Sequence, residues 1–427
     1  MTKTILFFIV AALAWAQAPN SDPKQRAKDV RELAKQGQDA IPRITPYVSD
    51  PDLNVRVEAV KALVAMGGPR IVDPLLTAAR DNDPEIQIRA TDGLVDVYLP
   101  GYVKTGMSGT VQRMGVNIRA KFGVDTNDQV IEEYVQVRPE VIAALGKLVT
   151  GGASIDVRAN AARAIGVLRG KDAIPELIEA LHSKQDAVMY EALVAIQKIR
   201  DPEAAGRISF LLRDLDDKIQ TTALETTGIL RNREAAPDVR DALEHARNIK
   251  IRRSATSALA MLSDPADHGA FVRDLNDKDD AIRSAAAEGL ARLEIPADRP
   301  LVEKAFNDER KMGPRLADAF AVVALGNADT GEFSSLRYLV NTLNIRAYRG
   351  VASAYLTELC RDLKIRQAIY PMLPRATKDE KIQLSIVFAR SGGRDSLPYL
   401  ESLSTDPDSE VAAEGTRSLR TLRARLP

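Results

Sequence analysis

The chain has 427 residues, with 59 Lys and Arg against 59 Asp and Glu, so its formal net charge is zero. A protein that neutralises many phosphates carries a basic surplus, which argues against a dedicated nucleic-acid binder. The hydrophobic share of 45% and the charged share of 28% are those of an ordinary folded protein. A single cysteine, Cys360, excludes an internal disulfide framework and any site built from four thiolates. We expect it to be a buried small hydrophobe.

Residues 1–16 are a predicted secretory signal peptide. Lys3 supplies a positive charge, residues 5–14 form an unbroken apolar run, and Ala14 and Ala16 flank Trp15 in a small-residue cleavage pattern. The run is too short to cross a bilayer, which takes about 20 residues. We predict cleavage after Ala16 and a periplasmic or secreted bacterial protein without a transmembrane anchor. The alternative is an uncleaved N-terminal anchor.

An alanine recurs along the chain at a nearly constant interval. Its spacings are 31, 71, 31, 31, 32 and 31 residues, and apolar residues lie four positions before and seven positions after each one. These positions share one face of a helix, and the small alanine lets neighbouring helices approach closely. The pattern fits loosely at Ala352 and Gly415, and poorly around Ala319 and Ser385. The seven anchor alanines are Ala59, Ala90, Ala161, Ala192, Ala223, Ala255 and Ala286.

A second helix is predicted after each first one, because a proline stands in its first turn. Asp-Pro pairs are predicted to cap helices, and no sustained period-two alternation indicates strands. The sequence therefore predicts an all-α solenoid of about eleven to twelve helical pairs over residues 17–427, each pair contacting only its neighbours. The prolines are Pro42, Pro175, Pro237 and Pro398, and the Asp-Pro pairs begin at Asp22, Asp50, Asp83, Asp201, Asp264 and Asp406.

Residues 155–168 (IDVRANAARAIGVL), followed by 172–178 (DAIPELI), carry a family resemblance. They resemble HEAT repeats, most of all the short repeats of the bilin lyases of phycobilisomes, and the resemblance extends over nearly all of the mature chain. It implies an α-solenoid of the kind used mostly by protein-binding scaffolds and by a few enzymes. One subgroup builds a di-iron hydroxylase from His-Glu pairs. None of His182, His245 and His268 precedes a glutamate, so the resemblance carries over no metal site.

The 71-residue spacing indicates an insertion of about 40 residues, at about 100–138, between the two helices of the third repeat. Between residues 100 and 124 it has four basic residues and no acidic one. Long insertions are often functional, so we predict a lid that faces a partner or a membrane. The alternative is a neutral ornament with solvated charges. The predicted partner contacts are Tyr102, Lys104, Arg113, Arg119, Lys121 and Phe122.

Other charges have two interpretations each. The stretch from Arg337 to Arg375 has seven basic residues against two acidic ones, with four tyrosines among them. It is either an anion-binding part of the groove or, as the interpretation we favour, a solvated face with tyrosines in the packing. Arginines three positions before an anchor are expected to pair with acids of adjacent turns rather than with a ligand. These are Arg56, Arg158, Arg252 and Arg283.

The sequence contains no motif that we assign to catalysis, to a cofactor or to a metal. We predict a non-enzymatic, extracytoplasmic scaffold that binds a protein or peptide partner in its groove, with no cofactor and no nucleic acid. The first alternative is a lyase-like or other enzyme accessory built on the same repeats. The second is a structural spacer without a specific ligand.

The predicted signal peptide holds the only tryptophan, Trp15. We therefore expect the exported protein to begin near Gln17 and to show no tryptophan fluorescence. N-terminal sequencing of protein extracted from the producing cells checks this, and finding Met1 would refute it.

Overall fold

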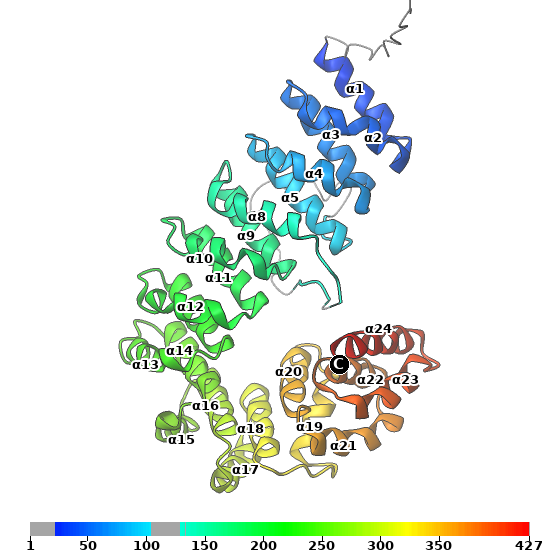
Figure 1. The fold of residues 1–427 in the computed structure, drawn as a ribbon. Helices are drawn as coiled ribbons and strands as arrows, with labels where there is room; N and C mark the ends of the chain where they lie inside the picture. The colour runs from blue at the N-terminus through cyan, green and yellow to red at the C-terminus, as the bar shows by residue number, and fades with distance from the viewer. Residues whose placement is uncertain (1–21, 104–128, 133, 427) are drawn as a thin grey trace, which may run out of the picture.

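The structure is a computed structural model, and it describes residues 22–103, 129–132 and 134–426. The predicted signal peptide lies outside these residues. The described residues form helices joined by short turns, without strands, and the helices stack in pairs along a curved solenoid (Figure 1). This confirms the all-α solenoid. None of the helices in these ranges is both long and apolar enough to cross a membrane.

One helix from each pair forms the first of two layers, and a last helix ends the stack. Consecutive members of this layer contact each other along the chain. The described residues thus contain eleven pairs and a C-terminal helix, as predicted. The first helices are α1 (Pro23–Ala34), α3 (Leu53–Met66), α5 (Pro84–Tyr98), α9 (Ile155–Val167), α11 (Asp186–Ile199), α12 (Asp217–Ile229), α14 (Ile249–Leu262), α16 (Asp280–Leu293), α18 (Met312–Ala324), α20 (Arg349–Leu359), α22 (Lys378–Ser391) and finally α24 (Ser409–Arg425).

The second helices are shorter, and 3₁₀ turns often precede them. In the fifth pair the predicted second helix is replaced by two 3₁₀ helices, η6 (Pro202–Arg207) and η7 (Ser209–Arg213), with Gly206 in the first of them. Glycine inside a helix is unfavourable, which is consistent with this interruption. The others are α2 (Ile41–Ile44), α4 (Val72–Ala78), α8 (Pro139–Gly151), α10 (Ile174–Ala180), α13 (Ala236–Glu244), α15 (His268–Asp274), α17 (Arg299–Asp308), α19 (Ser335–Thr342), α21 (Leu363–Ile369) with η11 (Tyr370–Arg375), and α23 (Leu397–Ser404).

All seven anchor alanines are completely buried in the first-helix layer. Glycines in the same helices also let neighbouring helices approach closely. A Cβ added to Gly166 of α9 would lie 2.7 Å from the Cα of Ala195 in α11, and one added to Gly228 of α12 would lie 3.0 Å from the Cα of Ala258 in α14. Neighbouring helices therefore touch through their backbones, and any larger side chain would force them apart.

The turns between pairs are braced by carboxylates in two roles. Asp83 and Asp22 cap α5 and α1 as the Asp-Pro pattern predicts. Asp50 and Asp406 do not, because the caps of α3 and α24 are the next acids, Asp52 and Asp408. Each of the two earlier acids instead accepts the amide two residues on and pairs with a base of the preceding helical pair.

The predicted arginine pairs form in three of four cases. Arg56, Arg252 and Arg283 pair with Asp81, Asp277 and Glu309 respectively, each in the turn that follows the same repeat. The fourth, Arg158, donates to the carbonyl of Gly152 at 3.1 Å. These contacts tie each turn to its own first helix.

The close approach at Gly166 predicts a specific cost. Gly166→Ala should lower the free energy of unfolding by about 1–3 kcal/mol through overpacking, although alanine favours helix more than glycine does. Gly151, at the end of α8, has nothing within 4 Å of the position of an added Cβ, so Gly151→Ala is the matched control and should not destabilise. Thermal unfolding followed by circular dichroism compares the two. Equal melting curves would contradict backbone contact between α9 and α11.

Candidate functional site

The C-terminal limb of the solenoid turns back toward the middle of the chain, so that its first helices α20, α22 and α24 lie on the side toward α9 to α12 (Figure 1). Within this bend lies an open groove with a volume of about 350 Å³, walled by α14, α16 and α20. Val351 of α20 is exposed at its surface. The first-helix layer thus forms the inner surface of the bend.

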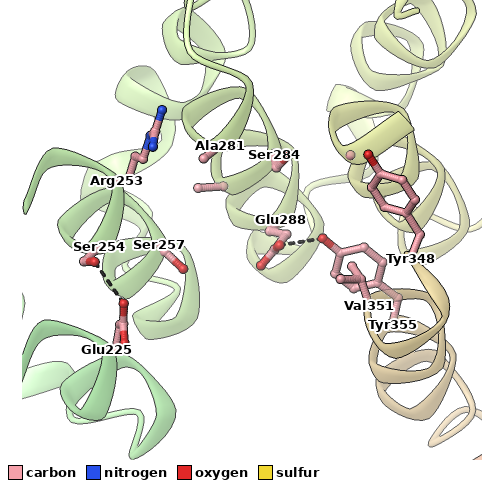
Figure 2. Close-up of a pocket in the computed structure, with 12 residues that line it drawn as sticks. Glu225, Arg253, Ser254, Ser257, Ala281, Ser284, Glu288, Tyr348, Val351 and Tyr355 are labelled. Atoms are coloured by element: carbon pink, nitrogen blue, oxygen red, sulfur yellow. Dashed lines mark hydrogen bonds between the residues drawn. The ribbon is translucent and has the colours of Figure 1, made fainter. Parts of the chain in front are cut away.

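One wall of the groove holds a partly buried carboxylic acid. Ser254 of α14 donates a hydrogen bond to Glu225 of α12 at 3.1 Å (Figure 2). Burial raises the pKa of Glu225, and the bond from Ser254 offsets only part of this shift. The side chain is therefore a weakly acidic hydrogen-bonding group at one end of the groove.

The other wall is held by a chain of paired polar groups. The hydroxyl of Tyr355 in α20 donates to Glu288 of α16 at 2.6 Å (Figure 2). Arg292 of α16 donates to Glu288 at 2.9 Å and holds both oxygens of Glu358 in α20 at 3.0 Å each. Arg231, just after α12, reaches the same carboxylate at 3.2 Å.

Within this network the pKa of Glu358 is lowered and the pKa of Tyr355 is raised. Burial opposes ionisation of Glu358, but the hydrogen bonds from Arg292 and the charges of Arg292 and Arg231 hold its pKa below the usual range. Burial is also the main reason that the pKa of Tyr355 is raised, and Glu288 adds to it. The groups are thus paired with each other, and Tyr355 donates from its neutral form.

The network also corrects the predicted contact pattern. The sequence predicts contacts between neighbouring pairs only, yet α20 contacts α16 two pairs earlier, and Glu358 is bonded to Arg231 four pairs earlier. Such contacts need a bend tight enough to bring distant repeats together, and a repeat pattern that describes one unit does not contain this information.

The predicted contact residues of the insertion are mostly outside the described part of the chain. Lys104, Arg113, Arg119, Lys121 and Phe122 fall there, and their role stays a prediction. Tyr102 is described and only 6% exposed, packed in the core just after α5. Its burial leaves the ring little surface for a partner.

Both ends of the interval between α5 and α8 are fixed to the solenoid. Asp96 accepts the amides of Gly101 and Val103 at one end. At the other end Arg138 pairs with Asp73 at 2.8 Å. The backbone N–H of Ile131 donates to the carbonyl of Val167 at 2.9 Å, at the end of α9.

The same segment also reaches the last helix. The Arg420 guanidinium of α24 lies 5.8 Å from the ring centroid of Tyr134. Two segments far apart in sequence therefore meet at the inner edge of the bend.

The histidines and the cysteine take structural places. His182 stacks on Phe210 with ring centroids 4.6 Å apart, and His268 Nε2 lies 2.8 Å from Asp298. Cys360 is fully buried, as expected, and burial raises the pKa of its thiol to about 12. Such a thiol is unreactive at neutral pH.

Sequence reasoning missed the residues that wall the groove. Tyr355 was expected in the packing and is there, but nothing marked Glu225, Glu288 or Glu358. Their only signal is a glutamate in the second half of a first helix, a common residue in any helix. Of the basic stretch, Arg349 and Arg366 are paired with Asp379 and Asp395.

Comparison with known proteins finds HEAT repeats at residues 10–95 and 142–208. The chain therefore contains HEAT repeats, as predicted. The first match begins inside the predicted signal peptide. No curated protein matches the sequence.

Several solved structures are similar at low identity. The CpcE–CpcF complex of phycocyanin lyase from Nostoc sp. PCC7120 is 17% identical, over 63% of this chain and 92% of that one, with a TM-score of 0.38. The Kap95:Nup1 complex is 10% identical over 95% of this chain and 66% of that one, with a TM-score of 0.43. Importin beta is 13% identical over 94% and 59%, with a TM-score of 0.38. No function is transferred from likenesses of this level.

The network predicts that Glu358 holds the bend. Glu358→Gln removes the negative charge that Arg292 and Arg231 share, and should lower the free energy of unfolding by about 1–3 kcal/mol. The loss is limited to this range because Arg292 keeps Glu288 as a partner. The substitution should also raise the radius of gyration measured by small-angle X-ray scattering. Glu401→Gln, in an exposed pair with Arg423, is the control and should change neither quantity. An unchanged radius for Glu358→Gln would show that other contacts set the bend.

Proposed function

We propose that this protein is an exported, non-enzymatic scaffold that binds a protein or peptide partner on the inner surface of its bend. The supporting observation is the groove walled by α14, α16 and α20, which offers the exposed Val351 beside fixed polar groups. Rigid helices that present a shallow polar and apolar surface suit a polypeptide, which has both backbone hydrogen-bonding groups and side chains.

The charged groups beside the groove favour binding over catalysis. Glu288, Glu358, Arg292 and Tyr355 are hydrogen-bonded to each other, and Ser254 is bonded to Glu225. A general base or nucleophile must be aimed at substrate, whereas these groups fix helices to one another. The enzyme-accessory alternative needs a group of this kind elsewhere.

Export rests on the pattern of residues 1–16 and is part of the same proposal. A solenoid released into the bacterial envelope would meet its partner there.

A photo-crosslinking amino acid at position 351 tests the groove as the binding surface. We expect a discrete crosslinked adduct when the protein is made in its own envelope, and none when the same amino acid replaces Leu215. Leu215 is 87% exposed on a turn outside the groove, so it controls for random collision. Adducts of equal yield at both positions, or none at 351, would refute the proposal. A purified protein that carries a coloured group would favour the enzyme-accessory alternative.

A further inference from the structure

Arginines from both limbs stand at the C-terminal ends of first helices, along the inner edge of the bend. Arg169, Arg200 and Arg231 follow the first helices α9, α11 and α12 at equivalent positions of three successive repeats. Arg361 follows α20, and Arg390 stands in the last turn of α22. All five are exposed.

Their convergence is visible in the electrostatics of Arg200. Removal of water by the surrounding protein lowers the pKa of its guanidinium, and the charges of Arg169, Arg390, Arg361 and Arg231 lower it further. The hydrogen bond of 3.2 Å from Arg231 to Glu358 of α20 places the ends of α12 and α20 side by side, so the two limbs meet at this edge. The gathering is therefore a property of the bend and not of one helix.

The backbone conformation adds to the cost of this arrangement. Arg169, Arg200 and Arg231 have φ angles of 49°, 58° and 53°, in the left-handed region that favours glycine. Cations do suit helix C-termini, and this accounts for part of the preference. It does not account for the placement of Arg361 and Arg390 opposite them.

Glu358 balances part of these charges, because the charges of Arg231 and Arg361 both act on its carboxylate. Glu358 is bonded to Arg231, but it is shared with Arg292. In the described ranges, no acidic side chain forms an ion pair with Arg200, Arg361 or Arg390. Arg200, Arg361 and Arg390 thus add positive charge to the inner edge, although the net charge of the whole chain is zero.

We propose that Arg200, Arg361 and Arg390, flanked by Arg169 and Arg231, bind an acidic segment of a polypeptide that lies between the two limbs. This inference rests on the proposed function and names the chemistry of the partner. Arginine is suited to it, because its planar fork donates two hydrogen bonds to one carboxylate.

The spacing favours a peptide over a single anion. Stacked helices are roughly 9–10 Å apart, so equivalent arginines in successive repeats are separated by about three residues of an extended chain at roughly 3.3 Å each. Carboxylates at every third residue would match this ladder. A single phosphate would span fewer of these positions than an extended chain does, and the zero net charge of the chain gives no general attraction to polyanions.

A labelled peptide with aspartate at every third residue, such as four copies of Asp-Ser-Ser, tests the proposal with the full mature chain. Fluorescence anisotropy at low salt should show saturable binding that weakens as NaCl rises. The double variant R200Q/R390Q should weaken binding by about tenfold or more. It should not lower the melting temperature, because it relieves repulsion between like charges. A loss of peptide binding could then not be explained by a loss of folding.

The control variant is R207Q/R375Q, which removes the same charge from the second-helix layer of the fifth and tenth pairs. It should change the affinity by less than about twofold. An equal loss in both variants, or no binding of the peptide to the unaltered protein, would overturn the proposal. The same peptide with lysine in place of aspartate should not bind.

Oligothymidylate and inorganic polyphosphate are the competing anions. If either displaces the peptide and binds more tightly at the same arginines, the occupant is a phosphate polymer and the peptide assignment is wrong. Adducts at position 351 without peptide binding would leave the scaffold proposal standing and refute only this inference. Peptide binding without such adducts would leave this inference standing and refute the groove at position 351 as the binding surface.

Discussion

The close approach of successive first helices is the constraint on which this structure depends. Ala192 and its six equivalents are fully buried, and Gly166 and Gly228 let backbones touch. No pair of helices this short could bury its apolar surface alone, so each repeat is stable because the next one covers it. The direction of the stack, and so the path of the whole chain, follows from how these small residues set one helix against the next.

Polar contacts act on top of that packing. In five repeats a base on the first helix pairs with an acid in the following turn, as Arg56 does with Asp81. The pairs that are partly exposed each contribute at most about 1 kcal/mol, but they fix where each turn lies. The residue after the first helix then adopts a left-handed conformation at a constant place. Arg169, Arg200 and Arg231 occupy this position in three successive repeats and therefore form a row along one edge.

The bend adds contacts between repeats that are far apart in the chain. It brings α20 onto α16 and lets Glu358 bind Arg292 and Arg231 together. Glu288 and Glu358 on the inner surface hold the limbs together, whereas Arg200, Arg361 and Arg390 at the edge form no ion pair with a described acid. This division of roles between neighbouring residues on the same surface is the basis of our proposal of an acidic polypeptide partner.

The sequence alone determined the repeat length, the anchor positions, the number of helical pairs, the prolines that begin second helices and the burial of Cys360. These depend on contacts within one repeat or with the next, so a periodic pattern records them. It misassigned the caps of α3 and α24, because Asp50 and Asp52 are equally good capping residues until their partners are known. Only the tertiary structure decided that Tyr102 is buried, that Tyr355 meets Glu288, and that Arg231 binds Glu358. Those contacts join repeats far apart in the chain. They arise because each repeat is rotated slightly against the one before it, and these rotations add up over several repeats. No single residue or repeat in the sequence reveals the total rotation.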